Sequence, residues 1–165
     1  MKKFELTSEF VTLLGKKLFR IKALISFGNV KEGELGGFVE KEENLSNDGN
    51  AWVSGNAWVS GNTRVCGDAR VYGNARVYGD AEVYGDARVY GNADYAMVHG
   101  FGSEYRTTTF FRTKAGDIGV RCGCFYGTLE EFRAKVKETH GETKTAKEYL
   151  RVADLMEFRF SKEEV

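Results

Sequence analysis

A six-residue alternation of apolar and polar positions dominates the middle of the chain. Valine stands at every sixth position, and a small residue stands two positions before each valine. The valines are Val53, Val59, Val65, Val71, Val77, Val83 and Val89, and the small residues are Ala51, Ala57, Thr63, Ala69, Ala75, Ala81 and Ala87. Residues two apart in a strand share a face, so both sets point inward and the residues between and after them point outward. Gly-Asn or Gly-Asp closes each unit, and these residue types tolerate the positive φ of a tight corner.

These hexads fit either a hairpin meander or a coil. Gly-Asn does form hairpin turns, but identical four-residue strands would make a weak sheet in which nothing distinguishes inner from edge strands. Coiling three hexads to a turn buries every valine in one axial core, and each strand then pairs with the coils above and below at about 4.8 Å. A fixed short period is typical of such solenoids. We therefore predict a mainly β protein built on a parallel β-helix.

The pattern continues beyond the hexads in weaker form. The outlying residues that keep an inward register are Val39, Leu45, Ala93, Tyr95, His99 and Phe101. The first two fall on the register of the small residues, and the last two fit only loosely. The β-helix is therefore predicted over residues 39–105, with three coils and a partial fourth.

Both flanks are expected to cap the strand edges that a β-helix exposes. Residues 1–38 form the N-terminal β cap, in which residues 3–27 are typical of a hairpin. Residues 106–165 form a C-terminal cap made of a β-hairpin and two α-helices. Thr128-Leu-Glu-Glu131 is a capping box that starts the first helix, and Thr145-Ala-Lys-Glu148 opens the second.

Composition narrows the functional classes. The chain has 165 residues with 20 glycines and no proline, which suits strands joined by sharp turns. Twenty-four basic residues balance 24 acidic ones, so net charge gives no strong signal for nucleic acid or an anionic membrane. We find no apolar signal-peptide core, no apolar run long enough to span a membrane, and no disulfide spacing among the three cysteines. These features predict a cytoplasmic location.

Three resemblances together cover nearly the whole chain. The hexads resemble the hexapeptide repeat of left-handed parallel β-helix proteins, which place an aliphatic residue first and a small residue four later, as in Val53 with Ala57. The segment ALISFGNVKEGELGGFVEKEENLS, leading into the repeats, resembles an uncharacterised enterobacterial β-helix family whose members are called acetyltransferases on the strength of the repeat alone. The tail, from TTTFFRTKAGDIGVRCGCFYGTLEEF to AKEYL, is similar to a segment of phage and prophage proteins. The resemblances imply a left-handed coil and a viral origin, and no established reaction.

The resemblance also directs attention to histidine, because left-handed β-helix acyltransferases use a histidine base at a cleft between subunits. His140 precedes a glycine that ends a helix, where a polar cap is ordinary. His99 is the single catalytic candidate, and a structural role at the end of the β-helix is its alternative. No hexad is interrupted by a loop that would hold an acyl carrier. Cys122 and Cys124 are expected on the buried face of a strand as small hydrophobes, so we predict no metal site and no cofactor.

The outward positions of the hexads supply the candidate binding residues. With three hexads to a turn, residues 18 apart stack on one face of the coil. The candidates are Arg70, Tyr72, Arg88 and Tyr90 on one face and Arg76 and Tyr78 on the next. Tyrosine and arginine are enriched in binding hot spots, and together they can stack on a nucleobase or hold a phosphate. The alternative is that arginines stack on tyrosines merely to solvate a β surface.

Three hypotheses for function follow. The first is a non-catalytic, phage-type binding protein that inhibits a bacterial defence system by binding a host protein or sequestering a nucleotide signal. The second is an acyl-CoA-dependent acetyltransferase with His99 at a subunit interface. The third is a virion or scaffold component. We expect self-association as a trimer or dimer in the cytoplasm of the host cell, and no membrane partner.

Overall fold

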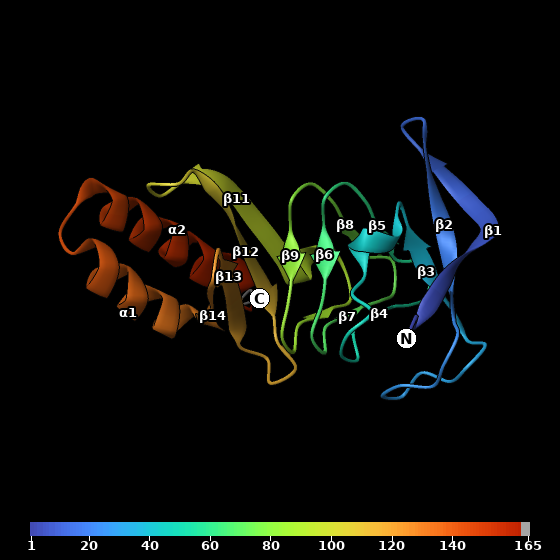
Figure 1. Ribbon diagram of the computed structural model, residues 1–165. Coiled ribbons are helices and arrows are strands. Elements are labelled where there is room, and N and C mark those ends of the chain that lie inside the picture. Colours follow the sequence, from blue (N-terminus) through green and yellow to red (C-terminus); the bar gives the residue numbers. More distant parts are fainter. Residues whose placement is uncertain (163–165) are drawn as a thin grey trace.

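The computed structural model describes residues 1–162, which form an elongated molecule. A β-hairpin lies at one end, two α-helices lie at the other, and a stack of short coils joins them (Figure 1). The molecule is mainly β, with both helices near its C-terminus. This agrees with the architecture that the sequence pattern predicts.

Seven two-residue strands form the walls of the central coil. They are β4 (Trp52–Val53), β5 (Trp58–Val59), β6 (Arg64–Val65), β7 (Arg70–Val71), β8 (Arg76–Val77), β9 (Glu82–Val83) and β10 (Arg88–Val89). They pair in parallel with partners 18 residues away, as Val53 does with Val71 and Val71 with Val89. The other walls repeat this offset in β5 with β8 and β6 with β9. The coil of three hexads per turn is confirmed, and the hairpin meander is excluded.

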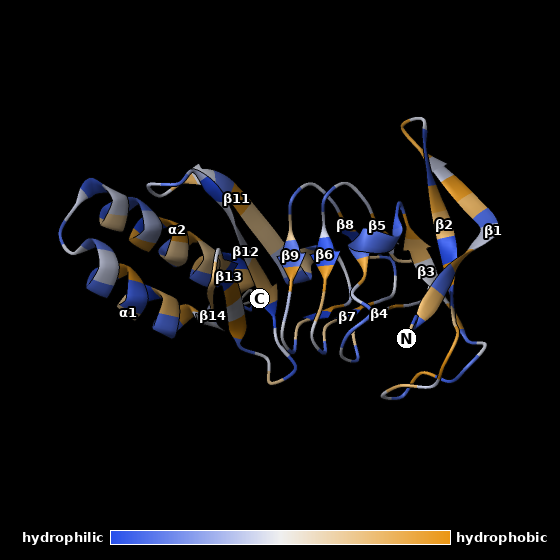
Figure 2. Ribbon diagram, viewed as in Figure 1, coloured by the Kyte–Doolittle hydropathy of each residue, from blue (hydrophilic) through white to orange (hydrophobic). Residues whose placement is uncertain are grey.

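The axial core is made by the two inward registers. All seven valines and all seven small residues of the hexads are at most 1% exposed. Burial of one valine side chain contributes about 1.5–3 kcal/mol relative to leaving it in water. Figure 2 shows the result on β6 and β9, where a hydrophilic residue is followed by a hydrophobic one.

The corners of successive coils also stack on one another. Gly61 has φ +67°, and a Cβ atom there would lie 2.9 Å from the carbonyl oxygen of Gly79 in the next coil, so glycine is required. The following residues form side-chain ladders, in which the Asn62 amide donates to the Asp80 carboxylate at 3.3 Å. The recurrent Gly-Asn and Gly-Asp pairs therefore serve both the turn and the stacking of turns.

The N-terminal cap extends one wall of the coil. β1 (Phe4–Leu13) and β2 (Lys16–Ala23) form an antiparallel hairpin, and β2 pairs antiparallel with β3 (Leu35–Val39). β3 then pairs in parallel with β5, giving a sheet in the order β1-β2-β3-β5-β8. The strand edge at this end of that wall is thus covered by the chain itself.

Lys3, which directly precedes β1, covers the same end of the core. Its side chain is 1% exposed, its ammonium group donates to the carbonyl oxygen of Ala51 at 2.9 Å, and it lies 4.7 Å from the centre of the Phe27 ring. Burial lowers its pKa from 10.5 to about 8.

The first coil corrects the register expected for Val39 and Leu45. Val39 pairs with Val59 and Leu45 with Val65, so both occupy valine positions rather than positions of the small residues. Both pairs are 20 residues apart, because the corner after Leu45 is two residues longer than later ones. Within that corner the Asn47 side chain accepts a hydrogen bond from the backbone of Lys3 at 2.9 Å. The extra residues therefore connect this coil to the N-terminal cap. A 3₁₀ turn, η1 (Glu42–Asn44), precedes the corner.

The chain leaves the coil at a second 3₁₀ turn, η2 (Asn92–Asp94), and the expected partial fourth coil does not form. Instead β11 (Tyr95–Phe101), β12 (Arg106–Arg112), β13 (Ile118–Cys122) and β14 (Phe125–Thr128) make an antiparallel sheet in that order. The edge of β8 is closed by side chains. The Arg76 backbone N–H donates to the Asn92 side chain at 2.8 Å, and its carbonyl oxygen accepts from the Tyr95 hydroxyl at 2.6 Å. Burial raises the pKa of Tyr95 to about 12.

The C-terminal sheet separates two cores. On β12, Phe110 packs with the two helices, and its neighbour Phe111 packs on the end of the coil, as strand alternation requires. α1 (Leu129–His140) begins at the predicted box, where the Thr128 hydroxyl accepts from the Glu131 backbone. α2 (Lys144–Phe160) has Thr143 as its N-cap, two residues before the predicted N-cap Thr145. The Thr143 hydroxyl accepts a hydrogen bond from the Ala146 backbone.

Candidate binding surface

The first predicted face lies on the wall formed by β4, β7 and β10, and its polar groups are largely engaged within the chain. The Arg88 guanidinium donates to the carbonyl oxygens of Asp68 and Ala87, both at 2.9 Å. Tyr72 packs edge-on against Tyr90, and burial, followed by the Tyr90 contact, raises the pKa of Tyr72. Burial, and then the neighbouring Arg88 charge, lowers the pKa of Arg70. On this face Tyr90 is exposed, whereas Arg70, Tyr72 and Arg88 are half-buried.

The N-terminal cap covers the start of that same face. Trp52, an outward position of its hexad, is 1% exposed. The Phe27 ring packs edge-on against it at 5.4 Å between centroids, and a Cβ atom on Gly36 would lie 2.7 Å from its indole. The outward tryptophan is therefore part of the cap interface, which the hexad pattern alone does not indicate.

The second predicted face, on the wall of β5 and β8, stays open. The Arg76 guanidinium stacks on the Trp58 ring at 4.2 Å from its centroid. Within residues 1–162 its side chain makes no hydrogen bond or ion pair, and Tyr78 beside it is 59% exposed. A planar guanidinium held on an indole, with its donors free, is suited to a carboxylate or phosphate.

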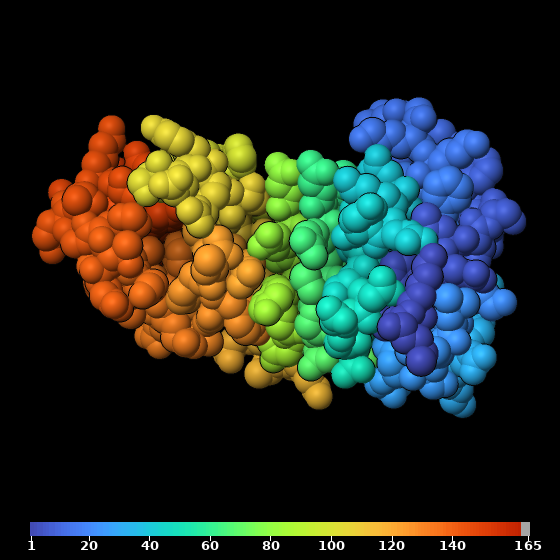
Figure 3. All heavy atoms as spheres, in the orientation of Figure 1, coloured from blue at the N-terminus to red at the C-terminus, as the bar shows by residue number. Residues whose placement is uncertain are grey.

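This open face is hollowed into a cavity of about 510 Å³ between the coil and the tip of the β1–β2 hairpin. Its lining residues are Leu13, Leu14, Lys16, Leu18, Glu40, Trp58, Ser60, Gly61, Arg76, Val77, Tyr78, Gly79 and Asn92. Figure 3 shows the outline of the molecule dipping over the central coils, between the blue hairpin and the yellow β11. The two caps thus form the raised sides of a saddle.

The carboxylate of Glu40, which lines this cavity, already has partners within the chain. Glu40 accepts a hydrogen bond from the Gly61 backbone at 2.6 Å and forms an ion pair with Lys16 at 3.3 Å. The Gly61 hydrogen bond is the main reason that the pKa of Glu40 is lowered. Glu40 therefore remains charged and bound, and it leaves Arg76 without an internal partner.

Sequence reasoning missed the hairpin tip. Leu14 is 96% exposed and has φ +48°, a region that β turns usually give to glycine or asparagine. Two leucines immediately before Gly15, at a turn between strands, were the available signal, because turn residues are normally polar or small. The structure brings this tip beside Arg76 and Tyr78, which the hexad pattern did identify.

His99 and Cys124 do not lie where the sequence pattern predicted them. His99 is exposed rather than inward, and its Nδ1 atom lies 2.8 Å from the Thr107 hydroxyl. Cys124 is also exposed, because β13 ends at Cys122 and the chain turns there. Cys122 keeps its expected inward place beside Tyr149. Cys66 is half-buried, and burial raises the pKa of its thiol.

Within residues 1–162 no helix combines the length and apolarity that crossing a membrane requires. No curated protein matches the chain. A family model described as the YdcK beta solenoid repeat matches residues 63–79 and 69–85. The match falls on the middle hexads, so the repeat region is similar to a known β-solenoid repeat.

Proposed function

We propose that this chain is a non-catalytic binding protein that holds a partner protein against the open face of its solenoid. The observation that carries the proposal is the Trp58–Arg76 stack, which lies in a cavity beside the exposed Tyr78 and Leu14. Aromatic rings and arginines that line a hollow are the usual anchors of protein interfaces. The uninterrupted hexads supply a rigid support for them.

The acetyltransferase hypothesis finds less support. The base would be His99, which lies exposed on β11 and is absent from the lining of the saddle cavity. Equilibrium dialysis with acetyl-CoA separates the two hypotheses. A binding protein is expected to show no saturable uptake, whereas uptake that disappears in His99→Ala would put the enzyme first.

Three finer points belong to the same proposal. The six-residue period and the resemblance of the hexads support a left-handed coil of the hexapeptide class. The resemblance of the tail to phage proteins supports a component of a bacterial defence system as the partner. The free cysteines support a reducing cytoplasm as the place where the two meet. Self-association is a second use of the same face, and the experiment below detects it.

Photo-crosslinking in the natural host tests the proposal. Tyr78 is replaced by p-benzoylphenylalanine, and Tyr90 on the other face is replaced in the same way as the control, since both side chains are about 60% exposed. We expect a discrete adduct from position 78 and none from position 90. The adduct should disappear when Arg76→Ser is added, and its mass identifies a partner or a second copy of the chain.

Two results would overturn the proposal. An adduct from position 90 alone would move the binding surface to the face of Arg70 and Arg88. An adduct from position 78 that survives Arg76→Ser would mean that the stacked arginine does not recognise the partner.

A further inference from the structure

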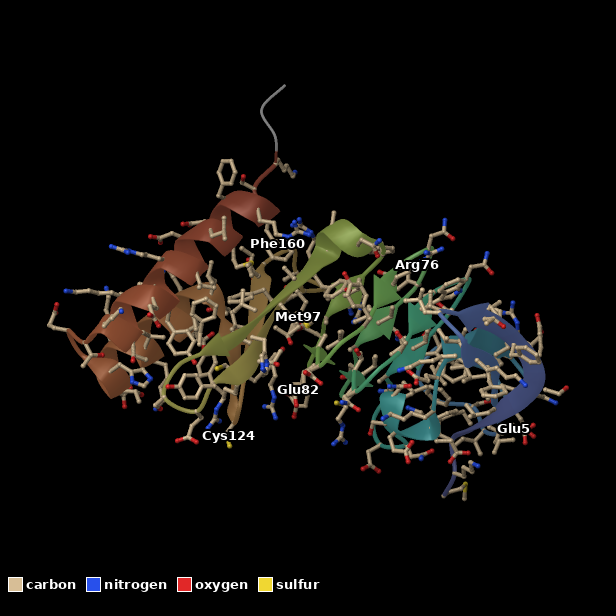
Figure 4. All side chains as sticks on the ribbon, turned by 90° about the horizontal axis from the view of Figure 1, so that it is seen from above. Glu5, Arg76, Glu82, Met97, Cys124 and Phe160 are labelled. Atoms are coloured by element: carbon tan, nitrogen blue, oxygen red, sulfur yellow. The ribbon has the colours of Figure 1, made fainter. Side chains whose placement is uncertain are left out.

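The saddle cavity continues along the molecule. A second cavity of about 340 Å³ shares Tyr78 and Asn92 with it. A third, of about 830 Å³, shares Ala96 and Arg159 with the second and reaches the last turn of α2. Figure 4 shows Arg76 on β8 and Phe160 at the end of α2 toward the same long side of the molecule. The three cavities therefore lie in a row from the hairpin tip to α2, and we call this row the trough.

The charged residues that line this trough are almost all basic. Among residues 1–162 they are Lys16, Arg76, Arg159 and Lys162, against the single carboxylate of Glu40. Glu40 is bound by Lys16 and the Gly61 backbone. In the described part of the chain Arg159 donates to two backbone carbonyl oxygens, those of Asn92 at 3.3 Å and Tyr95 at 3.4 Å. Within residues 1–162, Arg76 and Arg159 thus line the trough without an ion-pair partner, and they favour an anionic occupant.

Large apolar side chains stand at both ends of the trough. Leu14 at the hairpin tip is 96% exposed, and Phe158 at the end of α2 is 78% exposed, with Leu155 at 57% beside it. Exposed apolar residues that gather along a groove mark a contact with another molecule. Aliphatic side chains give little to a phosphate backbone, so these ends favour a polypeptide over a nucleic acid.

Building on the proposed function, we infer that the trough binds an extended segment of a partner protein in which acidic and large apolar residues are interspersed. Its carboxylates pair with Arg76 and Arg159, and its apolar side chains pack at the hairpin tip and against Phe158. The segment contacts both caps at once, and the coil between them sets how far apart these contacts lie. A groove of this kind recognises chemistry along a chain rather than a single side chain.

A peptide library supplies the test. Random 12-residue peptides displayed on phage are selected on the intact protein. The affinity of the enriched sequences is then measured with free peptides by fluorescence anisotropy. We expect enriched peptides with several Asp or Glu residues among Leu, Phe or Trp. Both Arg76→Ser and Phe158→Ser should weaken binding at least about tenfold, which corresponds to about 1.4 kcal/mol. Tyr90→Ser and Tyr105→Ser remove exposed rings outside the trough and should change it less than about twofold.

The outcomes distinguish binding in the saddle alone from binding along the whole trough. Binding that falls with Arg76→Ser but not with Phe158→Ser keeps the saddle as a binding site and overturns the trough. Enrichment of basic or uncharged peptides overturns the acidic partner. A failure to select any peptide that depends on Arg76 overturns the inference, while the crosslinking result at position 78 still decides the proposed function.

Discussion

Val77 and Tyr78 show how sharply the strand alternation divides two adjacent residues. Val77 is 1% exposed in the axial core, and Tyr78 is 59% exposed in the saddle. An aspartate at position 77 would be buried without a partner, so Val77→Asp should lower the free energy of unfolding by about 3 kcal/mol or more. The same replacement one position later, Tyr78→Asp, should change it by about 0.5 kcal/mol or less.

Urea unfolding followed by circular dichroism measures both variants. Equal midpoints for Val77→Asp and the parent would contradict the axial core. A large loss in Tyr78→Asp would instead give Tyr78 a structural role.

Lys3 gives the protein an unusual dependence on alkaline pH. Its pKa is about 8 in the folded chain and has the ordinary value of 10.5 when the chain is unfolded. Between these two values the unfolded state binds more protons than the folded state, so Lys3 makes stability rise with pH through this window. Below pH 8 both states are protonated and the cost of burying the charge is fully present.

The free energy of unfolding should therefore increase more in the parent than in Lys3→Met when the pH is raised from about 7.5 to about 9.5. Chemical denaturation at the two pH values measures this difference, and the variant cancels the contribution of the other titrating groups. Parallel changes in the two proteins would mean that Lys3 is not desolvated by the cap.

At the scale of elements, the start of α2 distinguishes two nearby threonines. The Thr143 hydroxyl accepts from the Ala146 backbone, whereas Thr145 lies inside the helix. Thr143→Ala should cost about 1 kcal/mol through loss of the cap. Thr145→Ala should be close to neutral, because alanine is the better helix former. Thermal unfolding of the pair checks this, and the opposite order would restore the box expected from the sequence.

The sequence predicts the elements that follow a period and misses those that depend on distant contacts. The valines, the corners and the capping box at Thr128 follow local rules, and the structure agrees with them. The place of Leu45 could not be predicted, because the longer corner after it is held by Lys3, far away in the chain. His99 has a similar explanation, since it lies where the register of β11 against β12 shifts, between Val98 and Phe101.

The same distinction between local pattern and distant contacts applies to the candidate site. Arg76 and Tyr78 stand at outward positions of their hexads, and the period alone predicts that they are exposed. Trp52 obeys the same rule and is nevertheless buried, because the N-terminal cap folds over it. The part played by Leu14 depends on where the hairpin is placed relative to the coil, and no local pattern contains that information.

At the scale of the whole molecule, the hexads determine how the two caps face each other. Each hexad turns the chain by a third of a coil, so one added hexad should rotate the C-terminal cap by a third of a turn about the axis. Three added hexads should restore the orientation and separate the caps by about 4.8 Å. Insertions of Ala-Arg-Val-Tyr-Gly-Asn, once or three times, between Asp68 and Ala69 test this.

Spin labels at positions 14 and 158 report the result, with the native cysteines replaced by serine. Both insertions should unfold cooperatively, since every new residue has an equivalent in the present coil. The triple insertion should retain peptide binding across the trough far better than the single one. Equal label separations in the two proteins would contradict the three-sided coil.

Nearly identical hexads also have a genetic consequence. Tandem DNA repeats gain and lose copies by slippage and unequal exchange, and here each such event would leave the folded core intact while changing the direction in which one cap faces. Selection for a groove that runs across both caps would then act on copy number. Among natural chains that share these two caps, length differences in the repeat region should fall in steps of 18 residues if the trough is used. Steps of six would indicate that the caps work independently.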